Sequence, residues 1–172
     1  LYLARFGAKT ALGGLAVGLL LFLSFLSKQT ALPIAVPVLV HLAWTGRRRA
    51  LAAGGTLLVL VVTSTLLLDR ATDGWYSYYA LDSMRQHDRL PEMWAGYWRD
   101  DLLRILPVAL LFSLLMLVRL MRRRDGEWTF YPLVLPGILL ICWAARLHEG
   151  SAPNSTLPAY IMLVILSACA AH

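Results

Sequence analysis

Charged residues are scarce in this sequence. They make up 15% of the 172 residues, against about 25% in an average soluble domain, whereas 59% of the residues are hydrophobic. A soluble protein of this length could not bury so much apolar surface. The apolar residues also lie in blocks that approach the roughly 20 residues of a membrane-spanning helix. The composition therefore predicts an all-α, polytopic transmembrane protein.

Cysteine and histidine are also rare, and no soluble-enzyme motif is present. The two cysteines and four histidines show no spacing for zinc, and there is no Gly-rich phosphate loop after a strand and no GxSxG motif. Cys142 and Cys169 both fall in apolar blocks, so we expect small core residues rather than a disulfide framework. The sequence indicates no cofactor and leaves a divalent metal open.

Six membrane spans are predicted, in a single transmembrane domain over residues 1–172. Their ranges are 10–27, 31–45, 51–68, 102–121, 130–147 and 156–171. Gly14 and Gly18 form a small-xxx-small pair in the first span. This pattern is more often a helix-packing surface than a ligand site.

Three basic clusters predict the orientation of the spans. Lysine and arginine outnumber acids 16 to 10, but they lie in short runs beside apolar blocks, which favours topology over nucleic-acid binding. The clusters are Arg5 with Lys9, Arg47 to Arg49, and Arg119 with Arg122 to Arg124. Six alternating spans put all three on one face, which the positive-inside rule makes cytoplasmic. We therefore expect a multi-pass protein of the inner or plasma membrane, with Lys28 and the 69–101 loop facing outward.

The 69–101 loop is too long for a plain connector. It is rich in Trp and Tyr, which prefer the headgroup level of a bilayer. One or two short helices lying in the outer interface would explain this composition. They would form a membrane-anchoring belt or a lid over a lipid-bound substrate, and the two interpretations are compatible.

Lys28 is a charged residue between the first two spans, with Gln29 and Thr30 beside it. A lysine at the bilayer centre is costly, and even one at a span end needs an explanation. Lys28 either snorkels outward from the helix end or binds an anion at the outer surface. The phosphate of a lipid carrier would lie at this depth, and an ammonium supplies charge and three donors.

Three segments resemble a known enzyme family. "LLLFLSFLSKQTALPIAVPVLVHLAWTGRRRALAAGG" (19–55) has an apolar span that ends in Lys-Gln-Thr, a short span and a basic turn. "DRATDGWYSYYALDSMRQH" (69–87) has a span end, a Gly-aromatic pair, further aromatics and a histidine. "RLHEGSAPNSTLPAYIMLVILSA" (146–168) has His, Gly, Asn and Pro before another span. Together they resemble polytopic glycosyltransferases of the GT-C superfamily, in the glycosyltransferase family 39-like branch of protein O-mannosyltransferases and the aminoarabinose transferase of lipid A.

The resemblance implies a membrane glycosyltransferase that acts at the outer, extracytoplasmic face. It would transfer a sugar from a polyprenyl-phosphate donor to a lipid, glycan or protein acceptor. The resemblance also implies that Lys28 contacts the donor phosphate. Residues expected in the outer cavity are Gln29, His87, His148, Glu149 and Asn154. We further expect Lys28, His148 and Glu149 to line one outward cavity.

The catalytic base is not identified. The family places a catalytic aspartate in its first outer loop, whereas the first outer turn here is Ser-Lys-Gln-Thr and holds no acid. This departure fits a fragment that lacks the family's N-terminal spans. If the base lies within this chain, the candidates are Asp69, Asp73, Asp88 and Glu149, each of a kind that is more often a solvated or paired loop acid.

Two other functions stay open. A transporter or channel subunit usually carries polar or charged groups at mid-bilayer, often on broken helices. The predicted spans hold few such groups beyond 63–65 and Ser113. A non-catalytic membrane scaffold is the other alternative, because the first-loop acid is missing.

Overall fold

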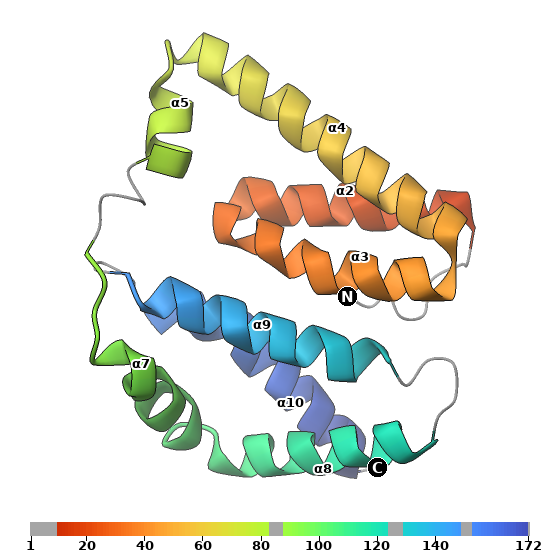
Figure 1. Cartoon of the computed structure of the whole chain (residues 1–172), viewed down its shortest axis with the longest axis vertical. Helices are drawn as coiled ribbons and strands as arrows, with labels where there is room; N and C mark the ends of the chain where they lie inside the picture. Colours follow the sequence, from red (N-terminus) through yellow and green to blue (C-terminus); the bar gives the residue numbers. More distant parts are fainter. Residues whose placement is uncertain (1–9, 83–87, 124–128, 149–152, 172) are drawn as a thin grey trace. The chain divides into compact units, whose positions relative to one another are not determined.

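The computed structural model describes residues 10–82, 88–123, 129–148 and 153–171. Within these ranges the chain is helical apart from turns and one isolated antiparallel bridge between Arg89 and His148. The chain divides into two compact units, Leu1–Gln86 and His87–His172. The all-helical prediction is therefore confirmed for the described residues (Figure 1).

The first unit is built on three apolar helices. They are α2 (Ala11–Ser27), α3 (Leu32–Thr45) and α4 (Arg47–Ala71), with the 3-10 turn η1 (Gln29–Ala31) between the first two. The Thr10 hydroxyl caps α2 by accepting the Gly13 N–H at 3.1 Å. After α4 come α5 (Trp75–Ser77) and the π-helical turn η2 (Tyr78–Asp82) (Figure 1).

Gly14 and Gly18 allow α2 to pack directly on α4. A Cβ at Gly14 would overlap the carbonyl oxygen of Arg49, and a Cβ at Gly18 would lie 2.5 Å from that of Ala53. Only a glycine permits this approach of the two backbones. The predicted helix-packing surface is thus confirmed. Arg49, which we interpreted as a topology signal, is buried in the first unit.

The second unit begins with a short helical segment that joins a longer helix at a bend. It contains α7 (Met93–Gly96), the π-helical η3 (Tyr97–Leu103), α8 (Pro107–Arg123), α9 (Phe130–Arg146), the 3-10 turn η4 (Pro153–Thr156) and α10 (Leu157–Ala171). Segment 93–103 meets α8 at an angle of 92°. Pro107 begins α8, where proline is tolerated because a first-turn N–H has no helical partner.

Each of the six predicted spans contains one apolar helix, but their lengths differ. By length and composition, Arg47–Ala71 and Pro153–Ala170 could each cross a membrane, and the bent pair 93–103 with 107–122 would make a third span. The remaining helices α2, α3 and α9 have 17, 14 and 17 residues. The described helices therefore support two or three membrane spans, and six crossings stay a prediction.

The starts of two spans differ from the predictions by four residues or more. Helix α4 begins at Arg47 rather than residue 51, and α8 begins at Pro107 rather than residue 102. The second difference arises because residues 102–106, which are apolar except for Arg104, belong to the end of η3 and to the bend. Hydropathy alone cannot separate a bend from a span, because both are apolar.

The two cysteines are not joined by a disulfide and have different surroundings. Cys142 is buried in the second unit, as predicted. Cys169 is exposed on α10, so its prediction as a core residue is wrong. The reason is that α10 is apolar on its exposed positions as well as in its core, as Ile161 and Val164 also show.

Ser113 joins α8 to α10. Its hydroxyl is buried and donates to the Leu163 carbonyl oxygen at 2.9 Å. We expect Ser113→Ala to lower the free energy of unfolding by about 1 kcal/mol, the typical net value of such a bond. The matched control is Ser167→Ala, because the Ser167 hydroxyl bonds only within α10, to Val164. Equal shifts of the denaturation midpoint in detergent for both variants would contradict this role.

Candidate functional site

Lys28 lies at the break between α2 and α3. It is the C-terminal cap of α2, with extended backbone at φ −159° and ψ 120°, and its N–H donates to the Ser24 carbonyl oxygen at 3.0 Å. The Lys28 carbonyl accepts the Ala31 N–H at 2.9 Å, which starts the next turn. The side chain is exposed and makes no hydrogen bond or ion pair with the described part of the chain. This helix end is therefore marked by a cation that has no carboxylate partner among the described residues.

The other predicted cavity residues are placed less directly. Gln29 begins η1 and is half-buried, and Asn154 is exposed in η4. His148 follows α9, and within the described ranges its Nδ1 is buried without a hydrogen-bond partner. His87 and Glu149 lie outside the described residues. Lys28 and His148 belong to different units, so their common cavity stays a prediction.

Two of the four candidate bases have structural roles at the end of α4 and in the turn that follows it. Asp69 Oδ1, in the last turn of α4, accepts the Ser77 N–H of α5 at 3.0 Å. Asp73 has a left-handed backbone, with φ 50°, and begins the reversal of the chain. Asp88 is exposed, and Glu149 is not among the described residues. These positions single out none of the four as a base.

A polar cluster in the second unit was not predicted. Arg146 Nε donates to Asp101 Oδ2 at 2.7 Å, and the two side chains are only 12% and 14% exposed. The Tyr160 hydroxyl donates to the backbone carbonyl of Asp101 at 2.7 Å. This group, the Asp101 cluster (Asp101, Arg146 and Tyr160), ties η3 to both α9 and α10.

Tyr97 lies close to the Asp101 cluster. It is fully buried, and its hydroxyl has no hydrogen-bond partner among the described residues. Cys142, Asp101 and Tyr160 are within electrostatic range of this hydroxyl. An unsatisfied buried polar group costs roughly 1–3 kcal/mol, so the packing of the Tyr97 ring must hold it there. The ring makes a T-shaped contact with Trp98, with centroids 5.0 Å apart.

The Asp101 cluster suits a structural role better than a catalytic one. A general base needs a lone pair within reach of the substrate proton, whereas the Asp101 carboxylate is mostly buried and ion-paired with Arg146. In the described ranges, no three His, Cys, Asp or Glu side chains come together to hold a metal. The cluster instead fixes the bent segment against its neighbours.

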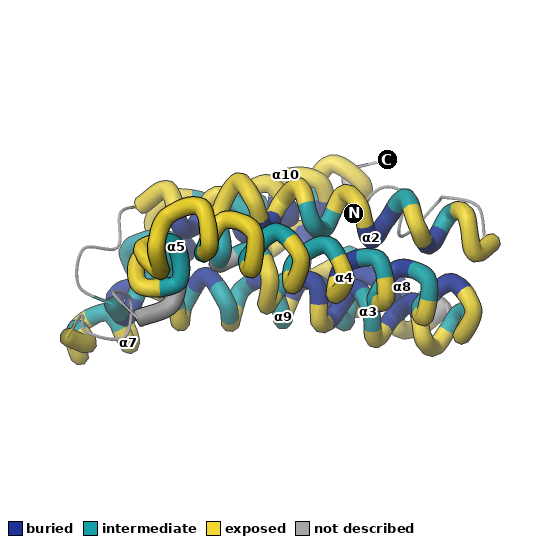
Figure 2. Tube along the Cα trace, turned by 90° about the horizontal axis from the view of Figure 1, so that it is seen from above, coloured by how far each residue is buried: buried dark blue, intermediate teal, exposed yellow. Residues whose placement is uncertain are grey.

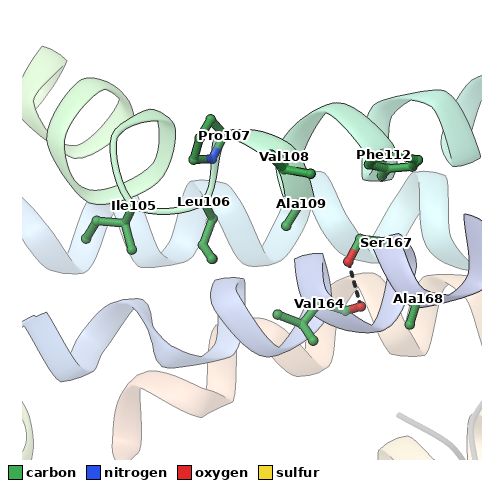
Figure 3. A pocket seen from close by; sticks show the side chains of 9 residues that line it. All are labelled: Ile105, Leu106, Pro107, Val108, Ala109, Phe112, Val164, Ser167 and Ala168. Atoms are coloured by element: carbon green, nitrogen blue, oxygen red, sulfur yellow. Dashed lines mark hydrogen bonds between the residues drawn. The ribbon is translucent and has the colours of Figure 1, made fainter. Parts of the chain in front are cut away.

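The second unit also carries an apolar groove of about 530 Å³ (Figure 3). Its lining consists of Ile105, Leu106, Pro107, Val108, Ala109, Phe112, Val164, Ser167 and Ala168. The volume is within the range of about 300–1,000 Å³ that small-molecule pockets occupy. The Ser167 hydroxyl donates to the Val164 carbonyl oxygen at 2.9 Å, so this donor is already satisfied. Such a lining favours a hydrocarbon chain.

The sequence could not have revealed the Asp101 cluster. Asp101 and Arg146 are 45 positions apart, and each stands at the end of an apolar stretch, where a solvated charge is expected. Comparisons of the chain with protein-family models, curated proteins and solved structures find no match.

Proposed function

We propose that the protein is a membrane glycosyltransferase. It moves a sugar from a polyprenyl-phosphate donor to a lipid, glycan or protein acceptor at the outer face of the bilayer. The observation that carries the proposal is Lys28, an exposed ammonium at the end of an apolar helix, without an ion-pair partner among the described residues. The resemblance of the three segments to GT-C enzymes adds the reaction class.

The chemistry of the donor fits this position of the lysine. When the sugar leaves a lipid phosphate, negative charge develops on the phosphate, and a cation close to it lowers the barrier. A free ammonium at a helix end supplies that charge and three donors. The apolar groove beside α8 supports the proposal separately, because an isoprenoid chain needs an apolar surface.

The test is binding and transfer with the reconstituted protein and a labelled polyprenyl-phosphate sugar. We expect Lys28→Gln to weaken donor binding by about 10- to 100-fold, because a charge-assisted hydrogen bond contributes roughly 1.5–3 kcal/mol. The thermal midpoint should stay unchanged, because the side chain is exposed and makes no hydrogen bond or ion pair with the described residues. Lys28→Arg should retain most of the binding, since it keeps the charge.

Arg70→Gln is the matched control for Lys28→Gln. Arg70 is also an exposed cation, in the last turn of α4 of the same unit. A loss of binding with Lys28→Gln alone supports a phosphate contact. Equal donor binding by Lys28→Gln and the parent protein rejects it and leaves Lys28 as a snorkelling span end. Failure of the parent protein to transfer any of several sugars rejects the enzyme proposal.

A transporter subunit is the second candidate. It is favoured by the 92° bend between segment 93–103 and α8, and by the largely buried ion pair of Asp101 with Arg146. Bent or broken helices and paired charges within apolar surroundings are typical of transport pathways. Solute flux through the parent protein in proteoliposomes would favour this function. Donor binding without transfer or flux would instead indicate a non-catalytic scaffold.

A further inference from the structure

Three aromatic side chains form one exposed face just after α4. Trp75, Tyr78 and Tyr79 are spaced as i, i+3 and i+4, so they share one side of the helical stretch. Their residues are 59%, 40% and 64% exposed. The rings contact each other, with centroids 5.8 Å (Trp75–Tyr78), 5.7 Å (Trp75–Tyr79) and 5.3 Å (Tyr78–Tyr79) apart. We call this group the aromatic triad.

The turn before the triad fixes its position against the end of α4. The Thr72 hydroxyl donates to the Leu68 carbonyl at 2.8 Å and accepts the Tyr76 N–H at 3.0 Å. Asp69 accepts the Ser77 N–H, as described above. Gly74 has φ 86°, a backbone conformation that glycine adopts without strain. The side chains of Asp69 and Thr72 therefore fix the turn between α4 and α5, and this turn holds the triad near the last turn of α4.

The length and composition of α4 would place this turn at one edge of the hydrocarbon layer if α4 crosses a bilayer. Its uncharged run extends from residue 50 to residue 68, between Arg47–Arg49 and Asp69–Arg70. At about 1.5 Å per residue this run is about 28 Å long, close to the roughly 30 Å of a bilayer core. Little of α4 is buried, and its end and α5 are exposed in Figure 2. The triad follows this run within one short turn, so with α4 across a bilayer it would lie at headgroup depth.

We infer that the aromatic triad is a membrane-interface anchor and that its partner is the glycerol and headgroup layer of a phospholipid bilayer. Indole and phenol rings combine an apolar body with a polar tip. The headgroup layer accommodates both parts, whereas water disfavours the apolar body and the hydrocarbon core disfavours the polar tip. The triad holds the end of α4 at a fixed depth. The inference uses only the first unit and does not depend on glycosyl transfer.

The test is fluorescence quenching of the protein reconstituted in phosphatidylcholine vesicles. The vesicles contain lipids brominated either near the carbonyl end or near the end of the acyl chain. The contribution of Trp75 is the difference between the parent protein and Trp75→Phe. We expect this contribution to lose more intensity to the shallow bromine than to the deep one, and to be shielded from aqueous iodide. Tyr76→Phe is the matched control, because Tyr76 is half-buried and outside the triad, and its profile should equal that of the parent.

Three outcomes would overturn the inference. Quenching by iodide without quenching by bromine would place Trp75 in water. Stronger quenching by the deep bromine would place it in the hydrocarbon core. Protection from both quenchers would mean that protein covers the triad, either another part of this chain or a second copy. A lid closed over a substrate would give the same protection.

Discussion

Gly18→Leu should destabilise the first unit by about 3 kcal/mol or more, at the upper end of the cost of overpacking a well-packed contact. The reason is the backbone approach of α2 to α4. A Cβ at position 18 would lie 2.5 Å from the Ala53 carbonyl oxygen and 2.8 Å from the Thr56 Cβ. A backbone carbonyl cannot move aside as a flexible side chain can, so the two helices must separate. The measurement is the unfolding midpoint in mixed detergent micelles, followed by circular dichroism.

The same chain offers a matched control. Gly55 is also a glycine within an apolar helix, but a Cβ there would meet nothing within 4 Å. Gly55→Leu should be neutral or slightly stabilising, because leucine has a higher helix propensity than glycine. Gly14→Leu should behave like Gly18→Leu. Similar midpoints for Gly18→Leu and Gly55→Leu would show that α2 and α4 do not pack through these glycines.

Asp101→Asn should produce the other large loss, of roughly 3 kcal/mol, the lower end of the cost of breaking a buried ion pair. The substitution preserves the shape of the side chain but removes the negative charge that accepts from Arg146 Nε, at a guanidinium that is only 12% exposed. The lost free energy is therefore mainly the lost attraction between two poorly hydrated charges. The measurement is again the unfolding midpoint, now with fluorescence of the Trp94–Trp143 pair, whose ring centroids are 5.0 Å apart.

The neighbouring acid provides the control for Asp101. Asp100 pairs with Arg99 at 2.8 Å, but these side chains are 43% and 75% exposed. Asp100→Asn should therefore leave the midpoint unchanged, because exposed ion pairs contribute little. The double variant Asp101→Asn with Arg146→Gln should recover part of the loss, since both charges are gone. A loss of transfer activity with Asp101→Asn at unchanged stability would contradict the structural role and indicate catalysis.

The helices themselves could be predicted from the sequence because each depends on local information. Apolar blocks predicted six helices, and the break at Lys28 is where α2 ends. The Gly14 and Gly18 spacing predicted a packing surface, but the identity of its partner depends on tertiary structure. The partner is α4, two helices along the chain, and nothing in the spacing distinguishes it from α3.

The bend and the Asp101 cluster could not be predicted for the same physical reason. Apart from Arg104, the residues from Leu102 to Leu106 are apolar and lead into α8, so hydropathy shows one block where the structure has two directions. Asp101 and Arg146 each look like a charge at a span end, and only the packing of η3 on α9 brings them together. Both features depend on contacts between segments distant in sequence.

The unequal lengths of α2 and α4 make bilayer thickness a variable for this protein. At about 1.5 Å per residue, the 17 residues of α2 extend about 26 Å and the 25 residues of α4 about 38 Å. The first length is shorter and the second longer than the roughly 30 Å thickness of the hydrocarbon layer. A longer helix accommodates this mismatch by tilting, and α4 runs obliquely to α2 in Figure 1. A shorter transmembrane helix draws the lipid surface toward its end. With α2 as a span, as the sequence predicts, that end would be Lys28. The hydrocarbon layer would then have to thin around Lys28 in thick membranes, whereas in thin membranes its ammonium would reach the phosphate layer without deforming the lipid.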